Sequence, residues 1–268
     1  MIAIIRHDFC AGIQKLKGKL LVFMIIVLIC GIAAITEFRD SGETGSTFAE
    51  IVAYSLGGVA PFMGERENIQ GFQMPVFWMV IQLYIAYVLG SYLIYDKSRY
   101  GIMLLLRTKN RKKWWAGKVI WTLIMISVLY FIMYILFFCM SDQRESWWKI
   151  RSAYTYIYNA DYSILGLQEI CLLIFILPIL TACALALLQL LMIFATNPIV
   201  AYGITGFLCA GSAFYESPFF IANNSMMIRS LDKIAVGATW ETIVLLLVVI
   251  FGVIILGGAI IERKDWLE

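Results

Sequence analysis

Histidine is almost absent from this chain, which contains only one, His7, among 268 residues. This histidine falls in the predicted interfacial helix at 1–19, so we expect neither a His-based catalytic triad nor a metal site built on imidazole groups. The six cysteines do not have the spacing of metal ligands either. The two glycines of a possible phosphate loop are separated by five residues instead of four, and Leu20 replaces the required hydroxyl residue. We therefore expect no metal, no cofactor and no enzymatic activity in the chain itself.

Charged residues are also scarce, at 15% of the chain, whereas 62% of the residues are hydrophobic and the mean hydropathy is +0.84. This composition is typical of an all-α polytopic membrane protein. The apolar runs predict six transmembrane helices, at residues 20–36, 74–95, 119–140, 170–195, 198–221 and 242–261. Ionisable groups are almost absent from these spans, although ion-coupled carriers usually keep several. Energy for any transport must then come from outside the chain.

The distribution of basic residues predicts the topology. Fourteen Lys and Arg residues lie in 1–19, 96–118 and 262–268, and seven lie elsewhere. By the positive-inside rule, both termini are cytoplasmic in a bacterial cytoplasmic membrane. The apolar run 170–222 would be roughly 80 Å long as one helix, so it must fold back, and Asn197-Pro198 is the expected turn. Because the charge is segregated by the membrane, we expect no nucleic-acid partner.

The first nineteen residues predict an amphipathic helix at the inner membrane interface. Apolar residues recur at three- and four-residue spacing, Phe9 among them, while Arg6 and His7 face elsewhere. Two interpretations remain open for this interfacial helix. It anchors the chain to the lipid bilayer, or it also acts as a lever that touches a cytoplasmic partner.

Three features are expected on the external side. The apolar stretch 48–63 lies in an acidic loop, and we expect it to dock on the outer leaflet. Cys139 and Cys171 fall near the outer ends of adjacent spans, where either a disulfide or two free thiols would fit. The sequence Glu216-Ser217-Pro218 predicts that the fifth span breaks near the outer surface and dips back.

A few polar residues interrupt the predicted spans and are candidates for lining a transport path. They could equally serve as interhelical hydrogen-bonding groups. These candidates are Gln82, Tyr84, Tyr87, Tyr202 and Thr205.

The segment between the second and third spans is the most informative part of the chain. Residues 96–118 carry eight Lys and Arg residues against one acid, with an apolar centre at 100–106. Such a short helix covers only about 10–15 Å and cannot cross a ~30 Å hydrocarbon core. It must therefore lie either on a partner or beneath its own bundle.

These elements resemble the permease subunit of a type-2 ATP-binding-cassette (ABC) exporter. The motif similarity covers about 25 residues, whereas the order of elements is similar over the whole chain. The matching positions are Asp96, Gly101, the apolar run 102–106, the run Arg107-Thr108-Lys109-Asn110-Arg111, Trp114, Trp115, Lys118 and the tail Glu262-Arg263-Lys264-Asp265.

The resemblance implies a short cytoplasmic coupling helix within the segment 97–113, which would sit in a cleft of a separate ATPase subunit. The ATPase-coupling residues would be Asp96, Arg99, Tyr100, Gly101, Met103, Leu104, Leu105 and Arg107. It further implies two copies of an ABC ATPase that carry ATP and Mg, and a second permease that forms a homodimer or a heterodimer with this one.

The expected substrate of such an exporter is hydrophobic or amphipathic, with a small peptide of the bacteriocin or lantibiotic type, for export or immunity, as our first hypothesis. Lipids, drugs and ions remain open. A non-transporting membrane scaffold or regulatory partner is the alternative function, and an intramembrane enzyme is a third.

Overall fold

The computed structural model describes residues 2–40, 45–60, 74–98, 111–143, 145–151, 162 and 165–263. Side chains are described from residue 12 onward within these ranges, except at positions 98, 232 and 235. This part of the chain is all-helical and contains no strand. Five of its helices are long and apolar enough to cross a membrane, so the chain is a polytopic membrane protein in its architecture.

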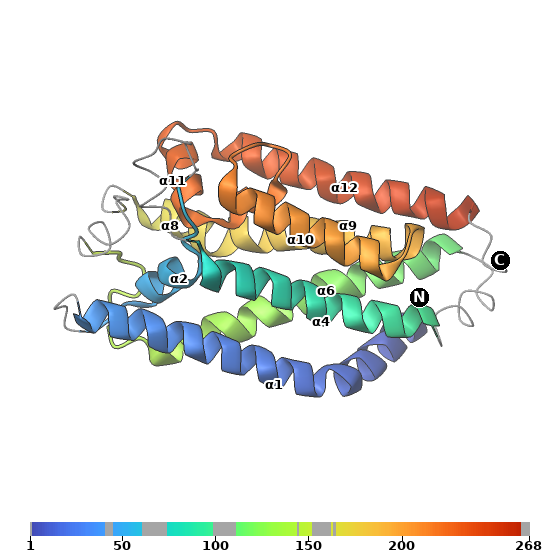
Figure 1. Ribbon diagram of the computed structural model, residues 1–268, viewed down its shortest axis with the longest axis horizontal. Helices are drawn as coiled ribbons and strands as arrows, with labels where there is room; N and C mark the ends of the chain where they lie inside the picture. Colours follow the sequence, from blue (N-terminus) through green and yellow to red (C-terminus); the bar gives the residue numbers. More distant parts are fainter. Residues whose placement is uncertain are drawn as a thin grey trace.

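The helices form a bundle in which the long elements run side by side (Figure 1). The start of α1, the turn between α9 and α10, and the end of α12 lie at one end of the bundle, and α2, α8 and α11 lie at the other (Figure 1). The elements in chain order are α1 (Ile2–Asp40), α2 (Phe48–Leu56), α4 (Val76–Ser98), α6 (Arg111–Met140), α8 (Leu167–Cys171), the π-helical turn η1 (Leu172–Ile176), α9 (Leu177–Ala195), α10 (Pro198–Phe214), the 3₁₀ turn η2 (Ile221–Ser225), α11 (Met227–Ala235) and α12 (Thr239–Arg263).

Four of the predicted spans, the second, third, fourth and sixth, coincide with long apolar helices, and the Asn197-Pro198 turn is confirmed. The four helices are the segments Val76–Lys97, Arg111–Met140, Leu167–Ala195 and Thr239–Arg263. Asn197 caps α10 by accepting a hydrogen bond from the backbone of Val200, and Pro198 occupies the first turn. The turn and the place of Pro198 are therefore as predicted, because Pro suits the first turn of a helix. The Asn197 cap, which the sequence analysis did not predict, fits the usual preference for Asn at that position.

The predicted boundary between an interfacial helix and a first span is not seen. One unbroken helix, α1, runs from Ile2 to Asp40. Its segment Gly12–Asp40 is long and apolar enough to cross a membrane. No proline or glycine pair interrupts the junction at residue 19, so the helix continues through the place where the amphipathic pattern ends.

The predicted fifth span, 198–221, is too long. Helix α10 ends at Phe214 after 17 residues, and the chain then folds back between α10 and α12 (Figure 1). A proline at 218 disfavours helix in the residue before it. The guanidinium of Arg229, which is 1% exposed, also donates to the terminal carbonyls of α10, including those of Ala213 (3.0 Å) and Tyr215 (3.1 Å). The predicted break of the fifth span before Glu216-Ser217-Pro218 is therefore confirmed, and the chain folds back after it.

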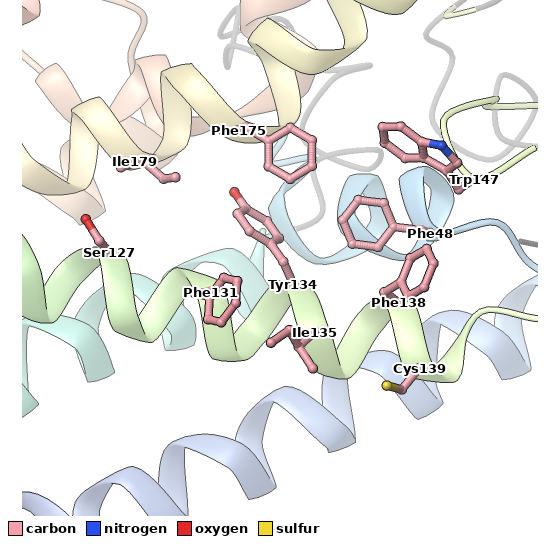
Figure 2. A pocket seen from close by; sticks show the side chains of 10 residues that line it. All are labelled: Phe48, Ser127, Phe131, Tyr134, Ile135, Phe138, Cys139, Trp147, Phe175 and Ile179. Carbon is pink, nitrogen blue, oxygen red and sulfur yellow. The ribbon is translucent and has the colours of Figure 1, made fainter.

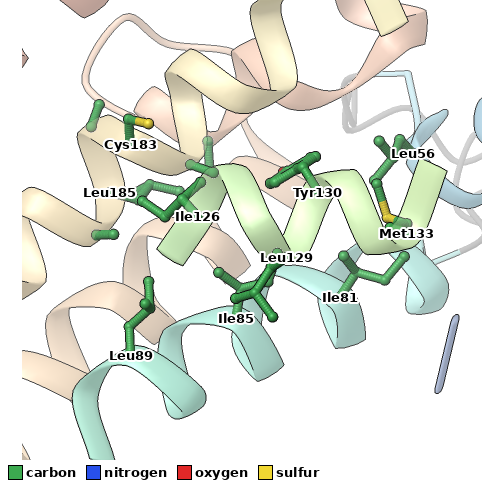
Figure 3. Packing of buried hydrophobic residues seen from close by; sticks show 14 of the residues in the cluster. Leu56, Ile81, Ile85, Leu89, Ile126, Leu129, Tyr130, Met133, Cys183 and Leu185 are labelled. Carbon is green, nitrogen blue, oxygen red and sulfur yellow. The ribbon is translucent and has the colours of Figure 1, made fainter. Parts of the chain in front are cut away.

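The core lies where α4, α6 and α9 meet (Figure 3). Helix α4 contributes Ile81, Ile85 and Leu89 at four-residue intervals, which places them on one face. Leu129 of α6 packs among them, and Leu185 of α9 approaches from the other side (Figure 3). Hydrogen bonding between Gln82 and Tyr130, both buried, ties α4 to α6 within this apolar interior.

Helix α2 packs inside the protein, so the prediction that residues 48–63 dock on the outer leaflet is wrong for the described part, 48–60. All but one of its residues are buried, and Glu50 is fully buried. The Glu50 carboxylate accepts two hydrogen bonds of 2.8 Å from the guanidinium of Arg151, and a third of 2.8 Å from the backbone of Thr47. This bidentate pair joins α2 to a loop 101 residues away.

Cys139 and Cys171, for which a disulfide or two free thiols had been left open, are both free thiols.

Candidate functional site

A buried ion pair marks the base of the predicted coupling segment. The ammonium of Lys118 lies 2.8 Å from the carboxylate of Asp96, and the side chains are 0% and 4% exposed. Asp96 is in the last turn of α4 and Lys118 is in the second turn of α6. The aromatic rings of Trp114 and Tyr92 flank the ammonium, with their centroids 5.5 and 5.9 Å away. The two helices that enter and leave the segment are thus held together by opposite charges.

Two further side chains join this pair of helices to α9. Lys97 donates hydrogen bonds to the backbone carbonyls of Ile193 and Thr196, at the end of α9. The Lys97 ammonium is favoured at this position because the C-terminal end of a helix carries the negative end of the helix dipole. Trp114 packs edge-on against Phe194 at 5.1 Å.

Helix α12 reaches the same end of the bundle. The indole of Trp115 donates to the carbonyl of Ile254 (2.9 Å), and its ring covers Gly257 so closely that no larger residue would fit there. Arg111 donates to the carbonyl of Glu262 at 3.0 Å, and Lys112 pairs with the Glu262 side chain at 3.0 Å. Four helices therefore converge on the base of the predicted coupling segment.

The sequence predicted a coupling segment at 97–113, and the structure assigns its two edges to helices. Lys97 and residue 98 belong to α4, and residues 111–113 belong to α6. Only Asp96 of the predicted coupling residues is described. The others, Arg99, Tyr100, Gly101, Met103, Leu104, Leu105 and Arg107, lie outside the described residues. Arg6, His7 and Phe9 lie within α1, and their side chains are outside the described part.

The predicted pathway residues do not line one common path. Gln82 and Thr205 face the same small cavity of about 10 Å³, which has room for about one water molecule. Tyr84 instead donates to the carbonyl of Lys19 (2.9 Å) and joins α4 to α1. Tyr202 donates to the carbonyl of Tyr87 at 3.3 Å, which joins α10 to α4. The tyrosines therefore act as links between helices in this conformation.

An aromatic groove that the sequence did not predict lies near the opposite end of the bundle (Figure 2). Its volume is about 500 Å³, within the ~300–1,000 Å³ usual for ligand sites. Phe48 of α2 is central, with ring centroids 6.1 Å from Tyr134 of α6 and 6.0 Å from Phe175 of η1. The lining residues are Phe48, Ser127, Phe131, Tyr134, Ile135, Phe138, Cys139, Trp147, Phe175 and Ile179.

The wall of this aromatic groove is shaped by a proline. Pro178 has no amide hydrogen, so it cannot donate to the carbonyl of Ile174 four residues earlier. The Tyr134 hydroxyl supplies that donor from α6. The π-helical turn η1 ends at Ile176, two residues before the proline, and places Phe175 in the groove. A sequence signal was present, because Phe131, Tyr134 and Phe138 recur on one face of α6.

The aromatic groove can hold apolar groups, and no charged side chain lines it. Neither the groove nor the basic end contains a group of three or more metal-ligating side chains among the described residues.

Comparison with known proteins assigns a family without assigning an activity. A family model described as protein of unknown function (DUF2705) matches residues 26–267. Neither the curated proteins nor the solved structures contain a match to the chain.

Proposed function

The chain belongs to the DUF2705 family, and we propose that it is the membrane subunit of an ATP-driven exporter of the type-2 ABC class in a bacterial cytoplasmic membrane. Two separate ATPase subunits would bind ATP and Mg, and a second permease would complete the pathway. In this proposal α10 is the fifth of six spans. Its 17 residues reach about 26 Å, at the short limit for crossing a bilayer.

The observation that carries this proposal is the Lys118–Asp96 ion pair. It ties the end of α4 to the start of α6, on either side of the twelve residues 99–110. A partner that displaces this segment would move both helices as a unit, because separating them would expose two buried charges. Lys97 and Trp115 extend the connection to α9 and α12. Because the two helices that flank this segment are fixed to each other and to α9 and α12, a movement of the ATPase at the segment would be passed on to these four helices.

A hydrophobic or amphipathic substrate, with a small peptide as the first hypothesis, is supported by the aromatic groove. Its walls are almost entirely apolar, and three of its residues, Phe131, Ile135 and Phe138, are more than 40% exposed. Transferring apolar substrate surface from water into this groove would contribute roughly 25 cal/mol per Å². An ionic substrate would find no matching charge in this groove.

The proposed orientation can be tested with single cysteines in a cysteine-free chain. Val236 and Thr196 lie in exposed positions at opposite ends of the bundle. Val236→Cys should react with an impermeant thiol reagent in intact cells, and Thr196→Cys should react only after the cells are opened. Labelling of Thr196→Cys from outside would invert the proposed topology.

The proposed function is tested by purifying the tagged chain from its native membrane and identifying any ABC ATPase that co-purifies with it. Replacing both Leu104 and Leu105 by Asp should abolish capture of the ATPase, because two buried leucines are worth roughly 3–6 kcal/mol. Val236→Asp, at the opposite end, is the control and should leave capture unchanged.

Reconstituted vesicles distinguish an exporter from a scaffold. The chain and its ATPase together should move a fluorescent amphipathic peptide only when ATP is hydrolysed. Capture of the ATPase without any ATP-dependent movement of peptide, lipid or drug probes would favour the scaffold function. Movement driven by a proton gradient with the permease alone would overturn the ABC proposal.

A further inference from the structure

Two adjoining cavities lie between the end of α10 and helix α12, away from both the basic end and the aromatic groove. Pro218 and Leu245 contribute to the walls of both. The first cavity has a volume of about 270 Å³ and the second about 350 Å³. The folded-back segment after α10 forms part of each wall, as its position between α10 and α12 indicates (Figure 1). We call the pair the α10–α12 cleft.

The first cavity is the polar part of the cleft. Glu216 follows α10, Lys233 is in α11, and Glu241 is in the first turn of α12, so its charged groups come from three elements. Both carboxylates are exposed, and the Lys233 ammonium donates to the Asn224 side chain at 2.7 Å. Burial lowers the pKa of Lys233, and Glu216 opposes that effect. The cavity therefore presents one cation and two anions to a ligand.

The second cavity is apolar and lies between α9, α10 and α12. Leu188, Met192, Ile204, Leu208, Phe219 and Val249 are among its lining residues. The neighbouring face of α12 carries large exposed apolar residues, including Val244 (56%) and Val248 (64%), as expected for a surface that contacts lipid. A molecule with an apolar chain could therefore enter the cleft from the bilayer.

Gln189 and Thr205 are the polar residues in the lining of the apolar cavity, and Gln189 is the larger of the two. Its side chain is 1% exposed, and its amide nitrogen donates to the carbonyl of Ala86 at 3.1 Å. Its amide oxygen finds no hydrogen-bond partner among the described residues. Gln189 also lines the small cavity that Gln82 and Thr205 face, which has room for about one water molecule. Buried polar atoms are normally satisfied, so a water there can supply the donor and leave the larger cavity to an apolar chain.

We propose that the α10–α12 cleft binds a single-chain zwitterionic amphiphile from the membrane. Its anionic group lies at Lys233, its cationic group lies at Glu216 and Glu241, and its apolar chain occupies the second cavity. The opposite charges in one small cavity favour a zwitterion over an anion, which the two carboxylates would repel. The modest volumes favour one chain over two. This binding requires no ATPase, so it can be tested apart from the proposed function.

The test uses a phosphocholine probe that carries one alkyl chain with a photoreactive diazirine. The purified full chain is placed in nanodiscs and irradiated, and the labelled peptides are identified by mass spectrometry. Labelling should concentrate in α10 and α12 around Leu208 and Val249. An excess of dodecylphosphocholine should compete with the probe, whereas a maltoside or a sulfate with the same chain should not.

Three variants test the two parts of the cleft. Lys233→Gln and Glu241→Gln should each weaken labelling about tenfold, the effect of losing one contact to a charged group. Leu245→Trp should abolish labelling by filling the shared wall. Lys149→Gln makes the same charge change at the same end of the molecule, outside the cleft, and should have no effect.

Three results would overturn the proposal. These are equal labelling with every head group, equal competition by a cationic trimethylammonium amphiphile, and labelling that survives both charge substitutions. Glu241 is exposed, so its substitution leaves the fold intact and remains informative if Leu245→Trp fails to fold.

Discussion

The buried Lys118–Asp96 pair allows a quantitative prediction, because removing one partner should destabilise the fold more than removing both. At an effective dielectric constant of about 20, the attraction across the pair is roughly 5–6 kcal/mol. Removing two charges from water costs several kcal/mol for each, so the pair itself contributes little net stability. Removing only one partner is different, since the other remains charged and buried.

We therefore expect Lys118→Met to lower the free energy of unfolding by about 3–5 kcal/mol, because it leaves the carboxylate of Asp96 buried without a counter-charge. Adding Asp96→Asn to this variant should recover at least half of the loss, although Asn alone is also destabilising. The two changes are then strongly non-additive, as contacting residues usually are.

The measurement is unfolding in mixed detergent micelles followed by tryptophan fluorescence, which the eight tryptophans make sensitive. The control is Lys112→Met, which breaks the ion pair with Glu262 at the same end of the bundle. Those side chains are 65% and 55% exposed, so the control should cost less than about 1 kcal/mol. Equal losses from Lys118→Met and Lys112→Met, or additive effects of the two buried substitutions, would refute the reasoning.

Three other substitutions test the half of the bundle opposite the Lys118–Asp96 pair by the same unfolding measurement. Tyr134→Phe should cost about 1–3 kcal/mol, because the carbonyl of Ile174 loses the donor that replaces a proline amide; an unchanged midpoint would contradict this role. Gly211→Ala should cost about 1–3 kcal/mol, because its new methyl group would lie 2.1 Å from the ring of Phe220, and an added Phe220→Leu should relieve part of that loss. Arg229→Met should cost about 3 kcal/mol or more, since several carbonyls at the end of α10 each lose a donor. Under the proposed function, capture of the ATPase should be unchanged, because it depends on the opposite end of the bundle.

The long helices could be predicted from sequence because their apolar runs exceed what any soluble helix requires. The turn at Asn197-Pro198 could also be predicted from sequence, because residues at a helix start act on their own backbone neighbours. Resemblance to a family motif singled out Asp96 and Lys118 separately, but their contact is seen only in the structure.

The remaining features depend on residues far apart in the chain. Glu50 appeared to be one of several acids in an external loop, yet its partner Arg151 allows it to be fully buried. The end of α10 depends on Arg229, which follows that helix by several residues and binds its carbonyls. Local periodicity carries no information about such contacts, so it placed α2 on the membrane and made the fifth span too long.

The placement of buried charges also limits how the described bundle can move. Asp96 and Lys118 lie at one end, and Glu50 and Arg229 lie at the other. Between them, the buried polar contacts are neutral ones such as that of Gln82 with Tyr130. Breaking a charged contact costs more than breaking a neutral one, so helix ends should keep their partners while the middle of the bundle adjusts. A force on residues 99–110 would then tilt α4 and α6 together. The apolar cavity of the α10–α12 cleft has walls made mainly of apolar side chains, so it would change shape more easily than the helix ends.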